Sequence, residues 1–171
     1  MPTQWASLLQ ERLVMDSNLF SCGKLEIPEA LKRDHEQLRG GLMRAAKEPG
    51  RIGEAAGRVA GLCLPHFAQE EDDIFRVFEL LRDPDSDRVP PNMAASARRI
   101  AQFSAKHLAL RSQHQSINAA VEVLLREARK EGNEEIAELI HTLRGHEKIE
   151  DEMMYPTVLT LCRSTRGSPA S

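Results

Sequence analysis

Residues 100–124 read IAQFSAKHLALRSQHQSINAAVEVL, and this stretch decides the fold. Apolar residues and two histidines recur in it at steps of three and four: Ile100, Phe103, His107, Leu110, His114, Ile117, Val121 and Leu124. Steps of three and four bring side chains to one face of an α-helix. The stripe is therefore typical of a helix packed into the core of a bundle.

Turn and cap residues divide the rest of the chain into further helices. They stand at Glu48-Pro49-Gly50, at 83–91 and at Gly132-Asn133. The pieces between them predict helices over about 28–47, 51–82, 92–131 and 133–162, with a kink at Pro65. We therefore expect an all-α protein, an antiparallel up-and-down four-helix bundle with an N-terminal extension.

The length of 171 residues suits one domain. We expect the bundle over about 28–163, an N-terminal extension at 1–27 with a short amphipathic helix around 5–14, and a mobile tail at 164–171. Only 4% of the residues are aromatic, which is low for an all-β fold.

Charge and hydropathy exclude two classes of partner. The net charge is −3 without a basic stripe, so we expect no nucleic acid. No apolar run approaches the roughly 20 residues of a membrane span.

The three cysteines, Cys22, Cys63 and Cys162, form no CxxC pair, and the first 20 residues lack a leader pattern. These features favour the cytoplasm.

Histidines on the apolar stripes are the candidate metal ligands. His66 is followed four residues later by Glu70, and His146 by Glu150, so each pair shares a helix face. His35 takes a position of the first helix where an apolar residue is the norm. His35 stands 15 residues before Gly50 and His66 stands 16 after it, which predicts that they face each other across a hairpin.

The third helix offers two candidates, His107 and His114. Gly132 follows His114 by 18 residues and precedes His146 by 14, whereas His107 is 25 residues away. At 1.5 Å per residue, the mismatch for His107 amounts to roughly 16 Å, which favours His114. His107 stays open because His107 to Arg111 repeats the pattern His-x-x-Leu-Arg that begins at His35.

Four imidazoles and two carboxylates suit two metal ions, with a carboxylate shared between them and positions left for a small ligand. These donors accept iron, manganese, zinc or copper.

Three segments together resemble the hemerythrin-like, HHE cation-binding family. They are Arg33-Asp34-His35 followed by Leu38-Arg39, the run His66 to Glu71, and His146-Glu147-Lys148-Ile149-Glu150 leading into Met154-Tyr155-Pro156. The resemblance covers about residues 28–160. It implies an up-and-down bundle with a non-haem centre of two iron ions, in proteins that bind dioxygen, sense oxygen, nitric oxide or iron, or help to repair iron-sulfur centres.

The chain departs from the oxygen-carrying members of that family. Those place His-x-x-x-His on the third helix, whereas Arg111 and Asn118 stand four residues after His107 and His114. Asp151, five residues after His146, has the spacing that the carriers use, so it is an alternative to Glu150. Ferritin-like di-iron bundles are disfavoured because neither His66 nor His146 has a glutamate three residues before it.

The leading functional hypothesis is a di-iron protein that binds or senses oxygen or nitric oxide, or handles iron, with a possible protein redox partner. The alternatives are a di-iron oxidoreductase that reduces oxygen or nitric oxide, and a metal-free helical interaction module. We expect exposed His141, Glu71 and Asp72, a buried Cys63 acting as a small apolar residue, and Asp73 near the site.

Overall fold

The computed structural model describes residues 27–75 and 93–166, and within these two segments the chain is helical apart from short turns. No strand occurs in the part that is described. The short helix expected around residues 5–14 lies outside the described residues, as does most of the expected tail. The all-helical fold class is confirmed.

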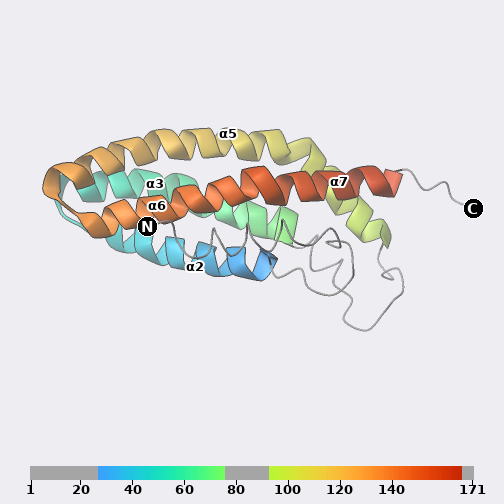
Figure 1. Ribbon diagram of the computed structural model, residues 1–171, viewed down its shortest axis with the longest axis horizontal. Helices are drawn as coiled ribbons and strands as arrows, with labels where there is room; N and C mark the ends of the chain where they lie inside the picture. The colour runs from blue at the N-terminus through green and yellow to red at the C-terminus, as the bar shows by residue number, and fades with distance from the viewer. Residues whose placement is uncertain (1–26, 76–92, 167–171) are drawn as a thin grey trace, which may run out of the picture.

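The helices follow the order that the turn residues predicted (Figure 1). Helix α2 covers Ile27–Ala45 and α3 covers Gly50–Glu70, with Pro65 inside it. A π-helical turn, η1, continues α3 over Glu71–Phe75. Helix α5 covers Met93–Glu131, and α6 covers Glu134–Ile149. A second π-helical turn, η2 (Glu150–Met154), joins α6 to α7 (Tyr155–Arg166).

Local chemistry explains where the helices start. Gly50 and Gly132 take φ values of 75° and 64°, a left-handed conformation that glycine adopts without cost from a Cβ atom. Asn133 caps α6 because its side chain accepts a hydrogen bond from the amide of Ile136 at 3.1 Å. Short connections between helices follow from these two turns.

The helices pack side by side along the long axis of the molecule (Figure 1). Helix α3 contacts α2 and α5, α5 contacts α6 and α7, and α2 contacts α6. Each of the four helices α2, α3, α5 and α6 thus contacts two or more of the others.

Two apolar clusters fill the interior. The larger one includes Leu38, Ile117 and Leu143, and the smaller one includes Leu31, Phe75, Phe103, Leu110 and Tyr155. Along α2, His35 separates Leu31 from Leu38, and along α5, His114 separates Leu110 from Ile117. A buried polar layer therefore lies between the two clusters.

Most of the predicted core positions are buried, with two corrections. The spacing of apolar residues in the sequence groups Leu62 with Val59 and Cys63, yet 40% of Leu62 is exposed, because the buried face of α3 is carried by Val59, Cys63 and the small residues Ala55 and Ala56. Helix α7 continues to Arg166, so residues 164–166 are helical rather than part of a tail. None of the helices in the described segments is both long and apolar enough to cross a membrane.

Candidate metal site

Six polar side chains meet in the layer between the apolar clusters, and we call them the donor cluster. Its members are His35, His66, Glu70, His114, His146 and Glu150, each of them 2% exposed or less. They come from α2, α3, α5, α6 and the start of η2. Buried ionisable groups are rare unless they are paired or bind a metal, so this concentration calls for a chemical explanation.

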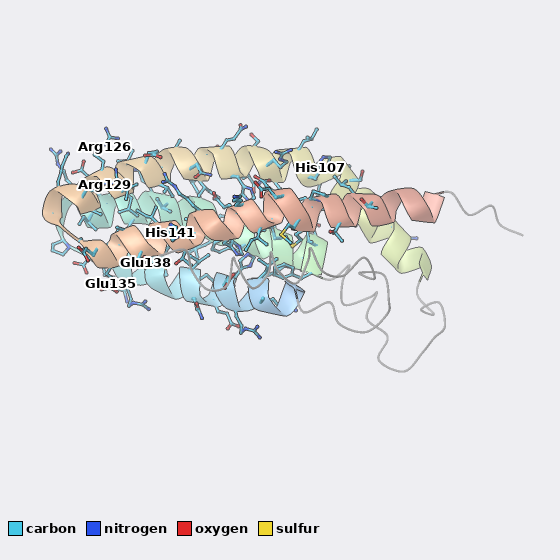
Figure 2. All side chains as sticks on the ribbon, viewed as in Figure 1. His107, Arg126, Arg129, Glu135, Glu138 and His141 are labelled. Carbon is cyan, nitrogen blue, oxygen red and sulfur yellow. The ribbon has the colours of Figure 1, made fainter. Side chains whose placement is uncertain are left out.

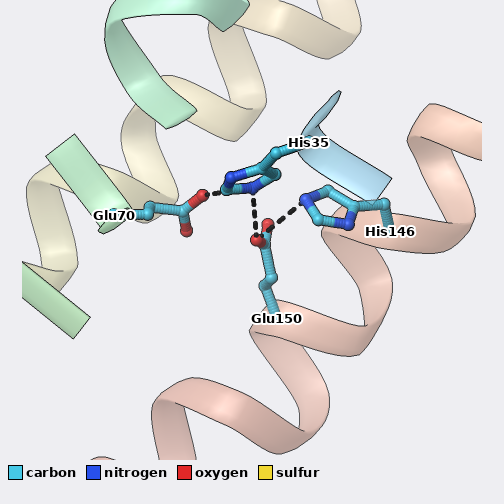
Figure 3. A group of neighbouring side chains, drawn as sticks. All are labelled: His35, Glu70, His146 and Glu150. Atoms are coloured by element: carbon cyan, nitrogen blue, oxygen red, sulfur yellow. Dashed lines mark ion pairs between the residues drawn. The ribbon is translucent and has the colours of Figure 1, made fainter. Parts of the chain in front are cut away.

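The donor cluster divides into two overlapping groups of four. His35 and His146 form one group with Glu70 and Glu150, and Figure 3 shows how these four side chains converge. His66 and His114 form the other group with the same two glutamates. In each group, one donor atom per residue lies within 4.8 Å of all the others, so each group can hold a metal ion.

The Nε2 atoms of the histidines face the two carboxylates. In the first group, His35 Nε2 lies 3.4 Å from both Glu70 Oε2 and Glu150 Oε1, and His146 Nε2 lies 2.9 Å from Glu150 Oε1. Imidazole nitrogen and carboxylate oxygen are common donors to divalent transition metals.

The second group has the same arrangement. His66 Nε2 lies 3.3 Å from Glu70 Oε2, and His114 Nε2 lies 3.4 Å from Glu150 Oε2. The two Nε2 atoms are 2.8 Å apart, so in the metal-free protein one proton at most lies between them.

The Nδ1 atoms point away from the carboxylates, toward other acceptors. His35 Nδ1 lies 2.9 Å from Glu71 Oε1, and His66 Nδ1 lies 2.7 Å from Gln113 Oε1. An acceptor at Nδ1 holds the proton there and leaves the Nε2 lone pair free for a metal.

The other two histidines have longer contacts of the same kind. His114 Nδ1 lies 3.3 Å from Asp151 Oδ2. His146 Nδ1 lies 3.6 Å from Asp34 Oδ2, which is longer than a hydrogen bond. All four imidazoles therefore present the same nitrogen to the centre of the cluster.

We call the contacts of the four Nδ1 atoms the outer contacts, and each of them involves a residue that is next to a member of the donor cluster in the sequence. Asp34 and Gln113 each directly precede a histidine of the donor cluster, and Glu71 and Asp151 each directly follow a glutamate of it. Each of them approaches a histidine from a different helical element. The contacts run in a closed ring from α2 to α3, to α5, to α6 and back to α2.

The charges of the metal-free cluster are strongly coupled. Burial, reinforced by repulsion from Glu150, raises the pKa of Glu70 to about 7. Burial also acts on Glu150, but the surrounding imidazoles, first among them His146 and His114, outweigh it and hold the pKa of Glu150 well below its usual value.

The imidazoles respond in opposite directions. Burial lowers the pKa of His66 to about 4. At His114 and His146 burial acts in the same direction, but the glutamates, chiefly Glu150, outweigh it and raise the pKa to about 9 and about 10. A metal cation would take the place of those protons.

Unsatisfied polar atoms test whether a metal fits these residues. Within the described segments, five inward-facing atoms of the cluster have no hydrogen-bond partner: His35 Nε2, Glu70 Oε2, His146 Nε2 and both oxygens of Glu150; the outward-facing Nδ1 atoms of His114 and His146 have none either. Leaving such atoms unpaired is costly, and all five are electron-pair donors directed at the centre. A pair of metal ions would supply the missing partners, so the residues fit such a group.

The structure also shows where the remaining sequence candidates lie. His107 lies outside both groups, partly buried on the outer side of α5 with its Nδ1 2.8 Å from the carbonyl oxygen of Ser104 (Figure 2). His114, the favoured of the two, lies with the other donors instead. His141 is exposed on α6, as expected.

Two carboxylates differ from their sequence interpretation. Glu71, expected to face solvent, contacts His35 and pairs with Arg39 at 2.9 Å, because η1 changes the helical period directly after Glu70. Asp73, expected near the site, instead pairs with Lys106 at 3.1 Å. Asp151 stays outside both groups and contacts His114 from the outside.

Sequence reasoning missed two further polar residues near the site. Tyr155 is buried, and its hydroxyl donates a hydrogen bond to Glu70 Oε1. Glu147 is buried as well and accepts a hydrogen bond from Asn118 Nδ2 at 2.6 Å. The proximity of Tyr155 and Glu147 to His146 and Glu150 in the sequence was the available signal.

Comparison with known proteins adds no relative: no family model, no curated protein and no solved structure matches the chain. The geometry of the donor cluster therefore carries the functional interpretation.

Proposed function

We propose that the chain is a hemerythrin-like protein whose donor cluster holds two iron ions and binds oxygen or nitric oxide, for sensing or for iron handling. One observation carries this proposal: two groups of buried donors overlap in Glu70 and Glu150. Two carboxylates common to both groups are the arrangement by which proteins hold a pair of ions close together.

The proposed architecture is an antiparallel up-and-down four-helix bundle. The short connections at 46–49 and 132–133 support it, because helices that are joined by short loops and pack together must run in opposite directions. The cyclic pattern of contacts among α2, α3, α5 and α6 supports it as well.

The donor set supports a site that is open to a small ligand. Each ion would have two imidazoles and a share of two carboxylates, fewer donors than a six-coordinate ion accepts, so positions remain. Iron in these positions supplies the redox chemistry and the affinity for a diatomic ligand. The chain itself holds and orients the donors, and the apolar clusters on both sides keep bulk water away.

Sensing or iron handling is favoured over oxygen carriage because α5 provides a single donor. His114 belongs to the cluster, whereas Asn118, one turn later, is engaged by Glu147.

Metal analysis of protein purified without chelator tests the proposal. We expect about two iron atoms per chain and an absorption band of oxo-to-iron charge transfer. A content below about one iron atom, with no such band, would contradict the proposal and favour the metal-free interaction module.

A matched pair of variants tests the site. His114→Ala removes a proposed ligand and should at least halve the iron content, whereas His107→Ala, on the same helix but outside both groups, should leave it unchanged. Equal iron contents in the two variants would show that the donor cluster is not the iron site.

A further inference from the structure

The two glutamates of the donor cluster are not equivalent. Glu150 has both oxygens free of hydrogen bonds, with Oε1 near His35 and His146 and Oε2 near His114. Glu70 has only Oε2 free, between the Nε2 atoms of His35 and His66. Its Oε1 accepts the hydrogen bond from the Tyr155 hydroxyl.

Burial and ring stacking hold the side chain of Tyr155 in place. Its side chain is fully buried, and its ring stacks on that of His114 with the centroids 5.8 Å apart and the planes at 11°. Its hydroxyl oxygen lies 3.5 Å from His114 Nε2. The Tyr155 hydroxyl, hydrogen-bonded to Glu70 Oε1, therefore lies beside His114, a donor of the second group.

The first group is enclosed differently. The ring of His35 stacks on Phe67, with 4.3 Å between centroids, and lies 5.3 Å from Phe75. Phe67 also packs edge-on against His146 at 5.8 Å. Phe67 also lies 6.0 Å from His66, so the difference between the two groups is the phenol hydroxyl that adjoins His114.

We propose that Tyr155 is a positioning residue that keeps Glu70 Oε1 off the metal and so reserves one coordination position for an added ligand on the ion held by His66 and His114. The inference rests on the proposed function. A carboxylate with one oxygen engaged by a phenol offers a metal one oxygen instead of two. The position that Oε1 would fill stays open beside His114, and a small anion or diatomic molecule binds there.

Azide is the probe, added to the oxidised, iron-loaded full chain and followed by its absorption. The variant Tyr155→Phe keeps the ring and its packing but removes the hydroxyl. Freed Glu70 Oε1 then competes for the open position, and we expect azide to bind about tenfold more weakly, the scale of one net hydrogen bond. Iron content should remain that of the unaltered protein.

Met154→Leu is the matched control, because Met154 is the buried neighbour of Tyr155 in the same apolar cluster. It should leave azide affinity within about twofold. If Tyr155→Phe also stays within twofold at full iron content, Tyr155 does not reserve the position and the inference fails.

A measurement on the unaltered protein covers the case in which Tyr155→Phe fails to fold. Mössbauer spectra of the iron-loaded chain should show two different iron environments, and azide should change one of them more than the other. Identical environments that respond equally would overturn the inference while leaving the proposed function intact. An unaltered protein without iron would overturn both.

Discussion

At the scale of single residues, the two nitrogens of each buried histidine have separate tasks. The Nδ1 atom hydrogen-bonds to an acceptor outside the cluster at His35 and His66 and lies near a more distant carboxylate at His114 and His146, whereas the Nε2 atom faces the shared glutamates. At His35 and His66 the hydrogen bond of Nδ1 fixes the orientation of the ring without a metal, so less ordering would have to accompany the binding of an ion. Glu71 is itself held by Arg39 at 2.9 Å, as Asp151 is by Arg111 at 3.3 Å.

Replacing Glu71 by alanine tests this division. Glu71→Ala removes the acceptor for His35 Nδ1, and loss of such a partner typically weakens metal binding about 10- to 100-fold. Competition with a chelator of known affinity measures the change. Glu36→Ala, an exposed neighbour of His35, is the control and should bind iron as the unaltered chain does. Equal losses of iron affinity in both variants would mean that any nearby negative charge strengthens metal binding, and that the contact of Glu71 with His35 Nδ1 has no special role.

The sequence predicts the members of the donor cluster more readily than it predicts the residues that contact their Nδ1 atoms. A histidine on an apolar stripe stands out, because the position normally carries an apolar side chain, and the His-x-x-x-Glu spacing adds Glu70 and Glu150; together these signals predicted all six members of the cluster, with His107 as a rival to His114. Gln113 and Glu71 carry no such signal, since they are ordinary polar residues in polar surroundings of the sequence. Their role follows from which helix packs beside them.

At the scale of helices, spacing predicted the elements but not their irregularities. The turns at Gly50 and Gly132 fixed the depth at which His35, His66, His114 and His146 meet. The π-helical turns η1 and η2 were not foreseen, because one widened turn leaves no mark in a pattern that is read at a period of 3.6. Both adjoin a glutamate of the cluster, which is why Glu71 was placed wrongly.

Close packing at the start of α3 predicts how substitutions there change the stability of the hairpin formed by α2 and α3. A Cβ atom on Gly53 would overlap the carbonyl oxygen of Glu48, a backbone atom that cannot move aside easily. Gly53→Ala should therefore lower the free energy of unfolding by about 1–3 kcal/mol.

Gly57, one turn further along α3, has open space where a Cβ would lie. Gly57→Ala is the control, and it should raise the free energy of unfolding by up to about 1 kcal/mol, because alanine favours the helix. Urea unfolding measures both. Stabilisation by both substitutions would show that the turn at 46–49 yields more readily than the packing suggests.

At the scale of the whole molecule, a charged layer between two apolar clusters makes stability depend on protons or on metal. In the metal-free protein, the pKa of His114 is raised to about 9 and that of His146 to about 10, from 6.5. A raised histidine pKa stabilises the folded state fully below pH 6.5, and this contribution is lost as the pH rises through the folded values.

We therefore expect chelator-treated protein to have a lower free energy of unfolding at pH 9.5 than at pH 6.5, as measured with urea. Raising the pKa of Glu70 to about 7 acts in the same direction, because its proton is lost more readily in the unfolded chain. The surface variant His141→Ala should keep this dependence, and loaded metal should reduce it. An equal free energy of unfolding of the chelator-treated protein at both pH values would contradict the link between stability and protonation of the donor cluster.

The closed ring of outer contacts has a consequence for assembly. A chain cut between residues 75 and 93 would leave three donors on each fragment and one outer contact within each, while the His66–Gln113 and His146–Asp34 contacts would exist only after the fragments had docked. Neither fragment alone contains all four residues of either metal-binding group. Metal ions bound as proposed would therefore join the two halves, and the free energy of their binding would stabilise the association of the fragments.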